Sequence, residues 1–284
     1  MNASAVPDAF PPAKTFALAL GVGGARALAH VAVIEALDEL GLRPAAISGS
    51  SFGALIGACY AAGMSGKAIR RHVIALAHDR GGIFSRLMAS RAASLSQWLA
   101  APLGNPVLID AAKFCAAFLP PEVPDDFSAL AIPLRIVATD LHAHGAVIYE
   151  AGPLKRAIAA SMAIPGLVQP VEVEGRVLID GAAVEPLPFG CLRGVADVVV
   201  AVDCSAGADE SGGVPGPWSA MFAALTVMSQ TIVTEKLKSG PPELLIRPNV
   251  GIFQLFDFFQ ASAILRAAEP AKAEVKERLP ALLG

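Results

Sequence analysis

A serine between two glycines constrains this chain more than any other feature. Residues 49–53 read Gly-Ser-Ser-Phe-Gly, the pattern G-x-S-x-G with Ser51 at its centre. The short run before it, residues 45–48, predicts a buried strand, and the small residues 54–62 predict a helix that ends at Gly63. A strand, a tight turn and a helix form a nucleophile elbow, because the glycines remove side chains that would clash at the turn. Ser51 is therefore a candidate nucleophile.

Strand-like and helical segments alternate along the rest of the chain. Residues 15–20 predict a strand that leads into a glycine-rich turn at residues 21–24. From residue 25 to residue 40 apolar side chains recur every three positions, which predicts one face of a helix. Helices are also expected at residues 64–79 and 111–119, and strands at residues 134–139, 146–149, 171–173, 176–179, 197–202 and 244–247. This order predicts an α/β fold, a three-layer α/β/α arrangement with a largely parallel central sheet.

The composition predicts a large apolar core. Hydrophobic residues make up 54% of the chain and charged residues only 17%, against about 25% in ordinary soluble proteins. Residues 1–14 read as a disordered leader, and residues 15–284 as a single domain. Within that domain, residues 16–202 form the expected core and residues 217–284 a mostly helical C-terminal part. The apolar content fits a lipid-docking face or an interface in a homo-oligomer equally well.

Charge and hydropathy exclude several classes of protein. The formal net charge is −3 and the basic residues are scattered, so nucleic acid is not an expected partner. No uncharged apolar segment approaches the roughly 20 residues that cross a bilayer. The N-terminal residues lack the cationic start and apolar stretch of a secretory signal. The four cysteines show no C-x-x-C spacing and are expected to be reduced thiols. The sequence thus predicts a cytoplasmic protein.

Asp180 is the candidate base for the serine. An α/β-hydrolase places a histidine after its acid in chain order, but no histidine of this chain follows Asp180. Asp180 closes the predicted strand 176–179 and precedes Gly181, at a strand end where open α/β sheets place their sites. A carboxylate whose pKa is raised by burial can accept a proton from a hydroxyl. His30, by contrast, is expected to be a hydrogen-bonded core histidine.

The glycine-rich turn supplies candidate donors for an oxyanion. Glycines let a backbone approach a ligand closely, so we expect the N–H groups of Gly21, Val22, Gly23 and Gly24 to form an oxyanion hole. Arg26 follows within the next turn and either supports this loop or contacts a ligand. The loop, the serine pattern and the aspartate each follow a predicted strand.

These motifs together resemble the patatin-like phospholipase family. Its pattern is a G-G-G-x-R-G loop, a G-x-S-x-G elbow and an Asp-Gly-Ala/Gly motif, which match residues 23–26, 49–53 and 180–182. The resemblance covers roughly residues 16–202 and implies a patatin-like fold with a Ser–Asp dyad. Val22 and Ala27 depart from the family pattern, since they stand where its first and last loop glycines would be.

The resemblance implies a serine acyl hydrolase that cleaves fatty acyl esters of phospholipids or lysophospholipids. In that chemistry Ser51 attacks the ester, Asp180 accepts its proton, and water releases the acyl-enzyme, with no metal or organic cofactor. Peripheral contact with the inner membrane surface is also implied. The head group, the chain length and the oligomeric state stay open.

Three other functions use the same residues differently. An esterase, thioesterase or acyltransferase would keep the dyad and change the acceptor of the acyl group. A dinucleotide-binding module needs glycine where Arg26 stands and an acid near Ser48 and Gly49, and both are missing. A catalytically silent lipid-binding relative is suggested by Val22 and Ala27. Residues 81–106, with Leu87, Leu95 and Trp98, are expected to cover the site.

Overall fold

The computed structural model describes residues 14–79, 81–82, 109–205 and 214–284. Apart from Lys14, the predicted leader lies outside these residues. The predicted cover of the site, residues 81–106, also lies outside them except for Gly81 and Gly82. Within the part of the chain that is described, no helix is long and apolar enough to cross a membrane.

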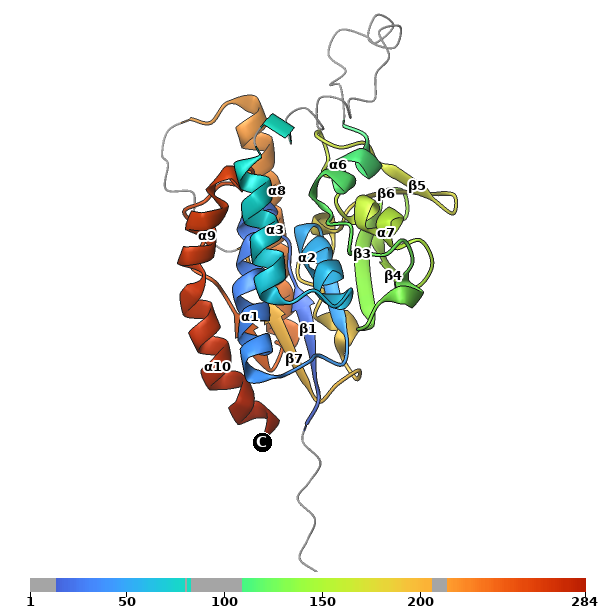
Figure 1. Ribbon diagram of the computed structural model, residues 1–284. Coiled ribbons are helices and arrows are strands. Elements are labelled where there is room, and N and C mark those ends of the chain that lie inside the picture. The colour runs from blue at the N-terminus through green and yellow to red at the C-terminus, as the bar shows by residue number, and fades with distance from the viewer. Residues whose placement is uncertain (1–13, 80, 83–108, 206–213) are drawn as a thin grey trace, which may run out of the picture.

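An eight-stranded mixed sheet forms the centre of the molecule (Figure 1). Its order is β5-β6-β3-β2-β1-β7-β8, and β4 pairs with β3 outside this path. Neighbours from β3 through β2, β1 and β7 to β8 run parallel, whereas the pairs that involve β4, β5 and β6 are antiparallel. The prediction of a largely parallel sheet is confirmed. The strands are β1 Phe16–Leu20, β2 Ile47–Ser50, β3 Leu134–Asp140, β4 Gly145–Tyr149, β5 Val171–Val173, β6 Arg176–Asp180, β7 Val198–Val202 and β8 Leu244–Ile246.

Helices cover both faces of the sheet, as the alternation in β1 requires. Phe16, Leu18 and Leu20 join the core under one helical layer, while Ala17 and Ala19 face the other layer. The first layer contains α1 His30–Leu40, α2 Phe52–Ala61, α3 Gly66–His78, α6 Ala111–Phe118, α7 Leu154–Ser161, α9 Ala261–Ala267 and α10 Glu269–Leu283. The second layer contains the segment around η4 Gly190–Leu192 and the long helix α8 Pro217–Ser239.

Two predicted boundaries differ from the structure near the glycine-rich turn and the serine. The helix expected at residues 25–40 begins as the 3₁₀ helix η1 Gly24–Ala29 and becomes α-helical only at His30. The Ala25 N–H donates to a carbonyl of the C-terminal segment, Leu255 O, so the first turn takes its hydrogen bonds from outside the helix. Strand β2 continues to Ser50 and α2 starts at Phe52, which leaves the whole reversal to Ser51.

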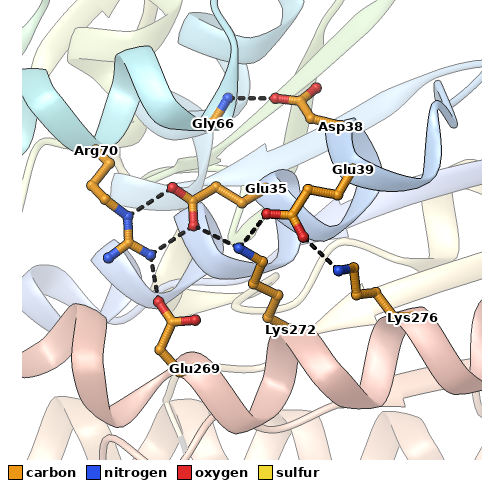
Figure 2. A network of polar contacts seen from close by, with 8 residues as sticks. All are labelled: Glu35, Asp38, Glu39, Gly66, Arg70, Glu269, Lys272 and Lys276. Carbon is orange, nitrogen blue, oxygen red and sulfur yellow. Dashed lines mark hydrogen bonds and ion pairs between the residues drawn. The ribbon is translucent and has the colours of Figure 1, made fainter.

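An ion-pair network joins three helices of the first layer (Figure 2). Glu35 of α1, which is buried, accepts two hydrogen bonds of 2.7 Å from Arg70 of α3. Arg70 also pairs with Glu269 at the start of α10, at 2.7 Å. Lys272 of α10 lies 3.5 Å from Glu35 and 2.5 Å from Glu39 of α1. The network therefore fastens the C-terminal helix to the helix that follows η1.

Candidate active site

The turn at Ser51 has the backbone strain of a nucleophile elbow. Ser51 has φ 55° and ψ −130°, and a positive φ is uncommon outside glycine. The flanking glycines are needed sterically. A Cβ at Gly53 would lie 2.3 Å from Leu20 O, and one at Gly49 would lie 2.5 Å from Ala54 Cα. The sequence thus brings α2 directly against the end of β1 and presents Ser51 at the helix N-terminus.

Ser51 and Asp180 meet in the structure. The Ser51 hydroxyl donates to Asp180 Oδ2 at 2.7 Å, although 129 positions separate the two residues. Asp180 ends β6, and its other oxygen, Oδ1, accepts the Ala182 N–H at 2.8 Å. Thr139 of β3 donates its hydroxyl to the Asp180 carbonyl at 2.9 Å, which fixes the strand end. Both dyad side chains are buried.

Burial tunes the carboxyl group of Asp180. Removal from water raises the pKa of Asp180 from its ordinary value of 3.8 to about 6, against the hydrogen bonds from Ser51 and Ala182, which lower it. A pKa near 6 leaves the carboxylate ionised at neutral pH and makes it a better proton acceptor than an ordinary aspartate. The arrangement can therefore take the proton of Ser51.

Ser161 holds the elbow from behind. The Ser51 N–H donates to Ser161 Oγ at 2.9 Å, and the Ser161 hydroxyl donates to Val137 O at 2.6 Å. All of these groups are buried. Ser161, the last residue of α7, was not predicted to belong to the site. Its segment carried only the family resemblance, and no spacing in the sequence connects it with Ser51.

Two of the four expected oxyanion donors are engaged elsewhere. The Gly21 N–H donates to Val202 O at 3.0 Å, which continues the pairing of β1 with β7. The Val22 N–H donates to Pro186 O at 2.8 Å. This differs from the expectation that all four amides face an oxyanion, because strand pairing and the neighbouring loop take the first two.

The N–H groups of Gly23 and Gly24 remain. Across the described ranges, the structure gives neither amide an acceptor. Gly24 has φ 55°, and the loop carries both amides along the cavity that contains Ser51. The candidate oxyanion hole therefore narrows to Gly23 and Gly24.

His30 supports this loop as a core histidine, in line with the expectation. Its Nε2 lies 2.8 Å from Gly21 O, and its Nδ1 lies 3.6 Å from the Cys204 sulfur. Burial lowers the pKa of His30 to about 4, so the ring is neutral. Because a carbonyl only accepts, Nε2 carries the proton and Nδ1 accepts from the Cys204 thiol.

A cavity of about 140 Å³ lies over the dyad. Arg26 lines it, is only 6% exposed, and has a buried Nε without a hydrogen-bond partner. Among the residues described, no ion pair or hydrogen bond to the Arg26 side chain is found, so no such bond braces the loop. Desolvation lowers the pKa of Arg26, which shows how poorly its charge is compensated. The remaining lining is Val22, Gly23, Gly24, Ser51, Ile164, Pro165, Asp180, Ala182, Ala183, Ser205, Leu225, Thr226, Met228, Ser229 and Leu255.

A larger cavity of about 530 Å³ opens between α6 and α7. It contains none of the predicted site residues, and its only charged lining residues are Lys155 and Arg156. Lys155 is paired with Asp125 and Arg156 donates to Glu172 O, so both cations are already engaged. The chemistry therefore lies with the smaller cavity.

The family model of the patatin-like phospholipases matches residues 18–192, which include the loop, the elbow and Asp180. The chain belongs to this family. The resemblance drawn from the motifs is thereby confirmed, and so is the patatin-like fold.

Three similarities of this patatin-like chain are informative about its extent. An uncharacterized NTE family protein of Mycobacterium tuberculosis is 40% identical over 187 residues, which are 66% of this chain and 48% of that protein. Lysophospholipase NTE1 of Coccidioides immitis is 29% identical over 292 residues, 94% of this chain and 18% of that protein. The structure of VipD from Legionella pneumophila is 14% identical, with a TM-score of 0.49 over 94% of this chain and 67% of that chain. The chain spans about half the length of the mycobacterial relative.

Proposed function

We propose that this chain is a serine acyl hydrolase that cleaves fatty acyl esters of phospholipids or lysophospholipids through a Ser51–Asp180 dyad. The observation that carries the proposal is the 2.7 Å hydrogen bond from the Ser51 hydroxyl to a buried carboxylate. Family membership supports lipid hydrolysis as the class of reaction.

The proposed reaction has two halves. Ser51 Oγ attacks the ester carbonyl carbon while its proton passes to Asp180 Oδ2. The tetrahedral oxyanion accepts hydrogen bonds from the N–H groups of Gly23 and Gly24. Collapse breaks the bond to the alcohol, which leaves with the proton from Asp180, and an acyl-enzyme remains. Asp180 then takes a proton from water, hydroxide attacks the acyl carbon, and the released Ser51 recovers its proton.

Arg26 supports a substrate with an anionic group close to the ester. Its guanidinium lies in the wall of the cavity without a partner, and a buried arginine without a partner is costly. A phosphate binds arginine through strong, charge-assisted hydrogen bonds. The diester phosphate of a phospholipid or lysophospholipid would supply that charge, whereas the acyl chain would contact the apolar part of the lining. Lysophospholipase is also the printed function of the fungal relative.

A lipid surface is the proposed peripheral partner of this site. From Pro217 to Thr234, helix α8 carries no charged side chain, although much of it is exposed. Trp218 is 56% exposed and Val227 is 62% exposed, while Met228 is 60% exposed at the edge of the cavity. Exposed apolar surface beside a lipid-binding cavity suits contact with acyl chains at a membrane interface.

Labelling with a fluorophosphonate ester tests the dyad. We expect mass spectrometry to place the adduct on Ser51, and we expect labelling to fall at least a hundredfold in folded Asp180→Asn. Ser51→Ala serves as the unlabelled control. A well-folded wild-type protein that is not labelled would instead support a silent lipid-binding relative.

Product analysis then separates hydrolysis from acyl transfer. Phosphatidylcholine and lysophosphatidylcholine are incubated with the protein in water, with and without glycerol as an acceptor. Free fatty acid as the main product in both conditions supports the hydrolase. Acylated glycerol as the main product would favour the transferase alternative.

A further inference from the structure

We propose that the turn formed by residues 255–258 is a positioning element of the active site. This inference rests on the proposed function, because it assigns a role in holding the oxyanion loop and the elbow. The turn lies beyond residues 18–192, which the family model matches, so the site of this chain is completed by its C-terminal part.

Leu255 holds the oxyanion loop through its backbone. Its carbonyl accepts the Ala25 N–H at 2.8 Å, at the first turn of η1. The contact is close: a Cβ on Gly24 would lie 2.3 Å from Leu255 O and 2.6 Å from Leu255 Cδ1. Ala25 follows the two amides without acceptors, Gly23 and Gly24, so this bond fixes the peptide units that would face the oxyanion.

Phe258 reaches the elbow from the same turn. Its ring lies 4.7 Å from the ring of Phe52, centroid to centroid, and 5.2 Å from that of Phe118. Phe52 is the residue directly after Ser51 and the first residue of α2. The turn therefore contacts both the loop that would bind the oxyanion and the helix end that presents the nucleophile.

Phe256 extends the contact to the third wall of the cavity. Its ring packs edge to face on Phe222 of α8, with centroids 4.9 Å apart. The turn is itself held in shape, because the Gln254 N–H donates to Asp257 Oδ2 at 2.8 Å. Three residues of one short turn thus contact η1, α2 and α8. A displacement of the turn would move all three walls together.

The C-terminal helix anchors this turn from the other side. The turn leads through η5 Phe258–Gln260 and α9 into α10. The network in Figure 2 fastens α10 to α1 through Lys272, Glu35 and Glu39. Since α1 continues directly from η1, the chain is clamped on both sides of the oxyanion loop. The geometry accounts for a loop that keeps two amides free without strain at Val22.

The test compares three variants of the full chain. Leu255→Ala removes the side chain that packs on Gly24 and loosens the turn, and Leu255→Met restores its bulk. Ile252→Ala is the matched control, because Ile252 is 77% exposed on the same segment and faces solvent. Rates are measured on p-nitrophenyl butyrate, a soluble ester that does not require a lipid surface.

A positioning role predicts a specific kinetic pattern. We expect kcat to fall about tenfold to a hundredfold in Leu255→Ala, with KM changed less than about threefold, because misplaced groups lose transition-state stabilisation. Leu255→Met should recover most of kcat, and Ile252→Ala should match the wild type. A rise in KM with unchanged kcat would overturn the proposal and leave Leu255 as a lining residue only.

Hydrogen exchange provides a readout that does not depend on catalysis. We expect the Ala25 amide to exchange at least tenfold faster in Leu255→Ala and at the wild-type rate in Ile252→Ala. If the soluble ester is not hydrolysed at all, the proposed function fails while exchange still reports on the clamp. Unchanged exchange of Ala25 would overturn the clamp whatever the activity.

A backbone substitution covers the case in which Leu255→Ala does not fold. Ala25→lactic acid, introduced by nonsense suppression, exchanges the N–H for an ester oxygen and removes only the donor to Leu255 O. We expect the same loss of kcat with nearly unchanged KM. Wild-type kcat in this folded variant would refute a role for the bond.

Discussion

Replacing Asp180 by asparagine should abolish activity and stabilise the fold at neutral pH. Burial raises the pKa of Asp180 from 3.8 to about 6, and the side chain is 3% exposed. That rise corresponds to about 3 kcal/mol of unfavourable free energy for the ionised form in the native state, at 1.36 kcal/mol per tenfold change. Asparagine carries no charge, keeps an oxygen for the Ala182 N–H, and leaves the Ser51 hydroxyl as an acceptor for its amide.

The sign of the pH dependence follows from proton binding. The native state binds the proton of Asp180 more tightly than the unfolded state, so its contribution to stability is complete below pH 3.8 and is lost as the pH rises through about 6. Urea unfolding at pH 4 should therefore give similar stabilities for wild type and Asp180→Asn. At pH 8 the variant should be more stable by up to about 3 kcal/mol, an increase in Tm of several degrees.

Asp197→Asn is the matched control for this experiment. Asp197 is exposed, and hydrogen bonds from the Thr15 N–H and hydroxyl lower the pKa of its carboxyl. Its contribution has the opposite sign, so this variant should lose stability at neutral pH and approach the wild type in acid. Asp180→Asn that is less stable than the wild type at pH 8, or equally stable at every pH, would refute the argument that burial raises the basicity of Asp180.

The remaining predictions concern the same site. The value of kcat/KM should rise with pH through about 6 and be roughly tenfold lower at pH 5 than at pH 7, because Asp180 must be ionised to act as the base; a flat profile would contradict this. Ser161→Ala should destabilise the fold by about 1–3 kcal/mol, measured by urea unfolding, since it leaves the Ser51 N–H buried without its acceptor. Gly24→Ala should lower kcat about a hundredfold in ester assays, because its φ is 55° and the new Cβ would lie 2.3 Å from Leu255 O; wild-type turnover would show that the loop tolerates displacement.

Much of the fold could be predicted because its signals are local. Apolar runs bounded by glycine or charge predicted most strands to within two residues, and the alternation of strands and helices predicted the layers. The antiparallel edge of β4, β5 and β6 was not predicted, since pairing direction depends on how distant segments meet. The 3₁₀ start of the first helix was missed for the same reason. Its Ala25 N–H is taken by Leu255, which lies far along the chain.

The two reacting groups were predictable because each follows a strand. Ser51 and Asp180 both stand at strand ends next to glycine, and parallel packing brings such ends to one edge of the sheet. Ser161 was not predictable, because a serine in a run of small residues has no signal of its own. The state of the loop amides was not predictable either, since Pro186 and Val202 decide which N–H groups are already paired.

The departures at Val22 and Ala27 do not make this chain a silent relative. A β-branched residue would strain the loop if it needed a positive φ or a free N–H, but Val22 is absent from the described residues with positive φ, and its N–H is bonded to Pro186 O. Ala27 is fully buried within η1, past the amides in question. The positive φ falls on Gly24, where the family pattern and this chain agree. Both replacements therefore stand where a side chain is compatible with the loop, and the argument for a damaged oxyanion hole loses its physical basis.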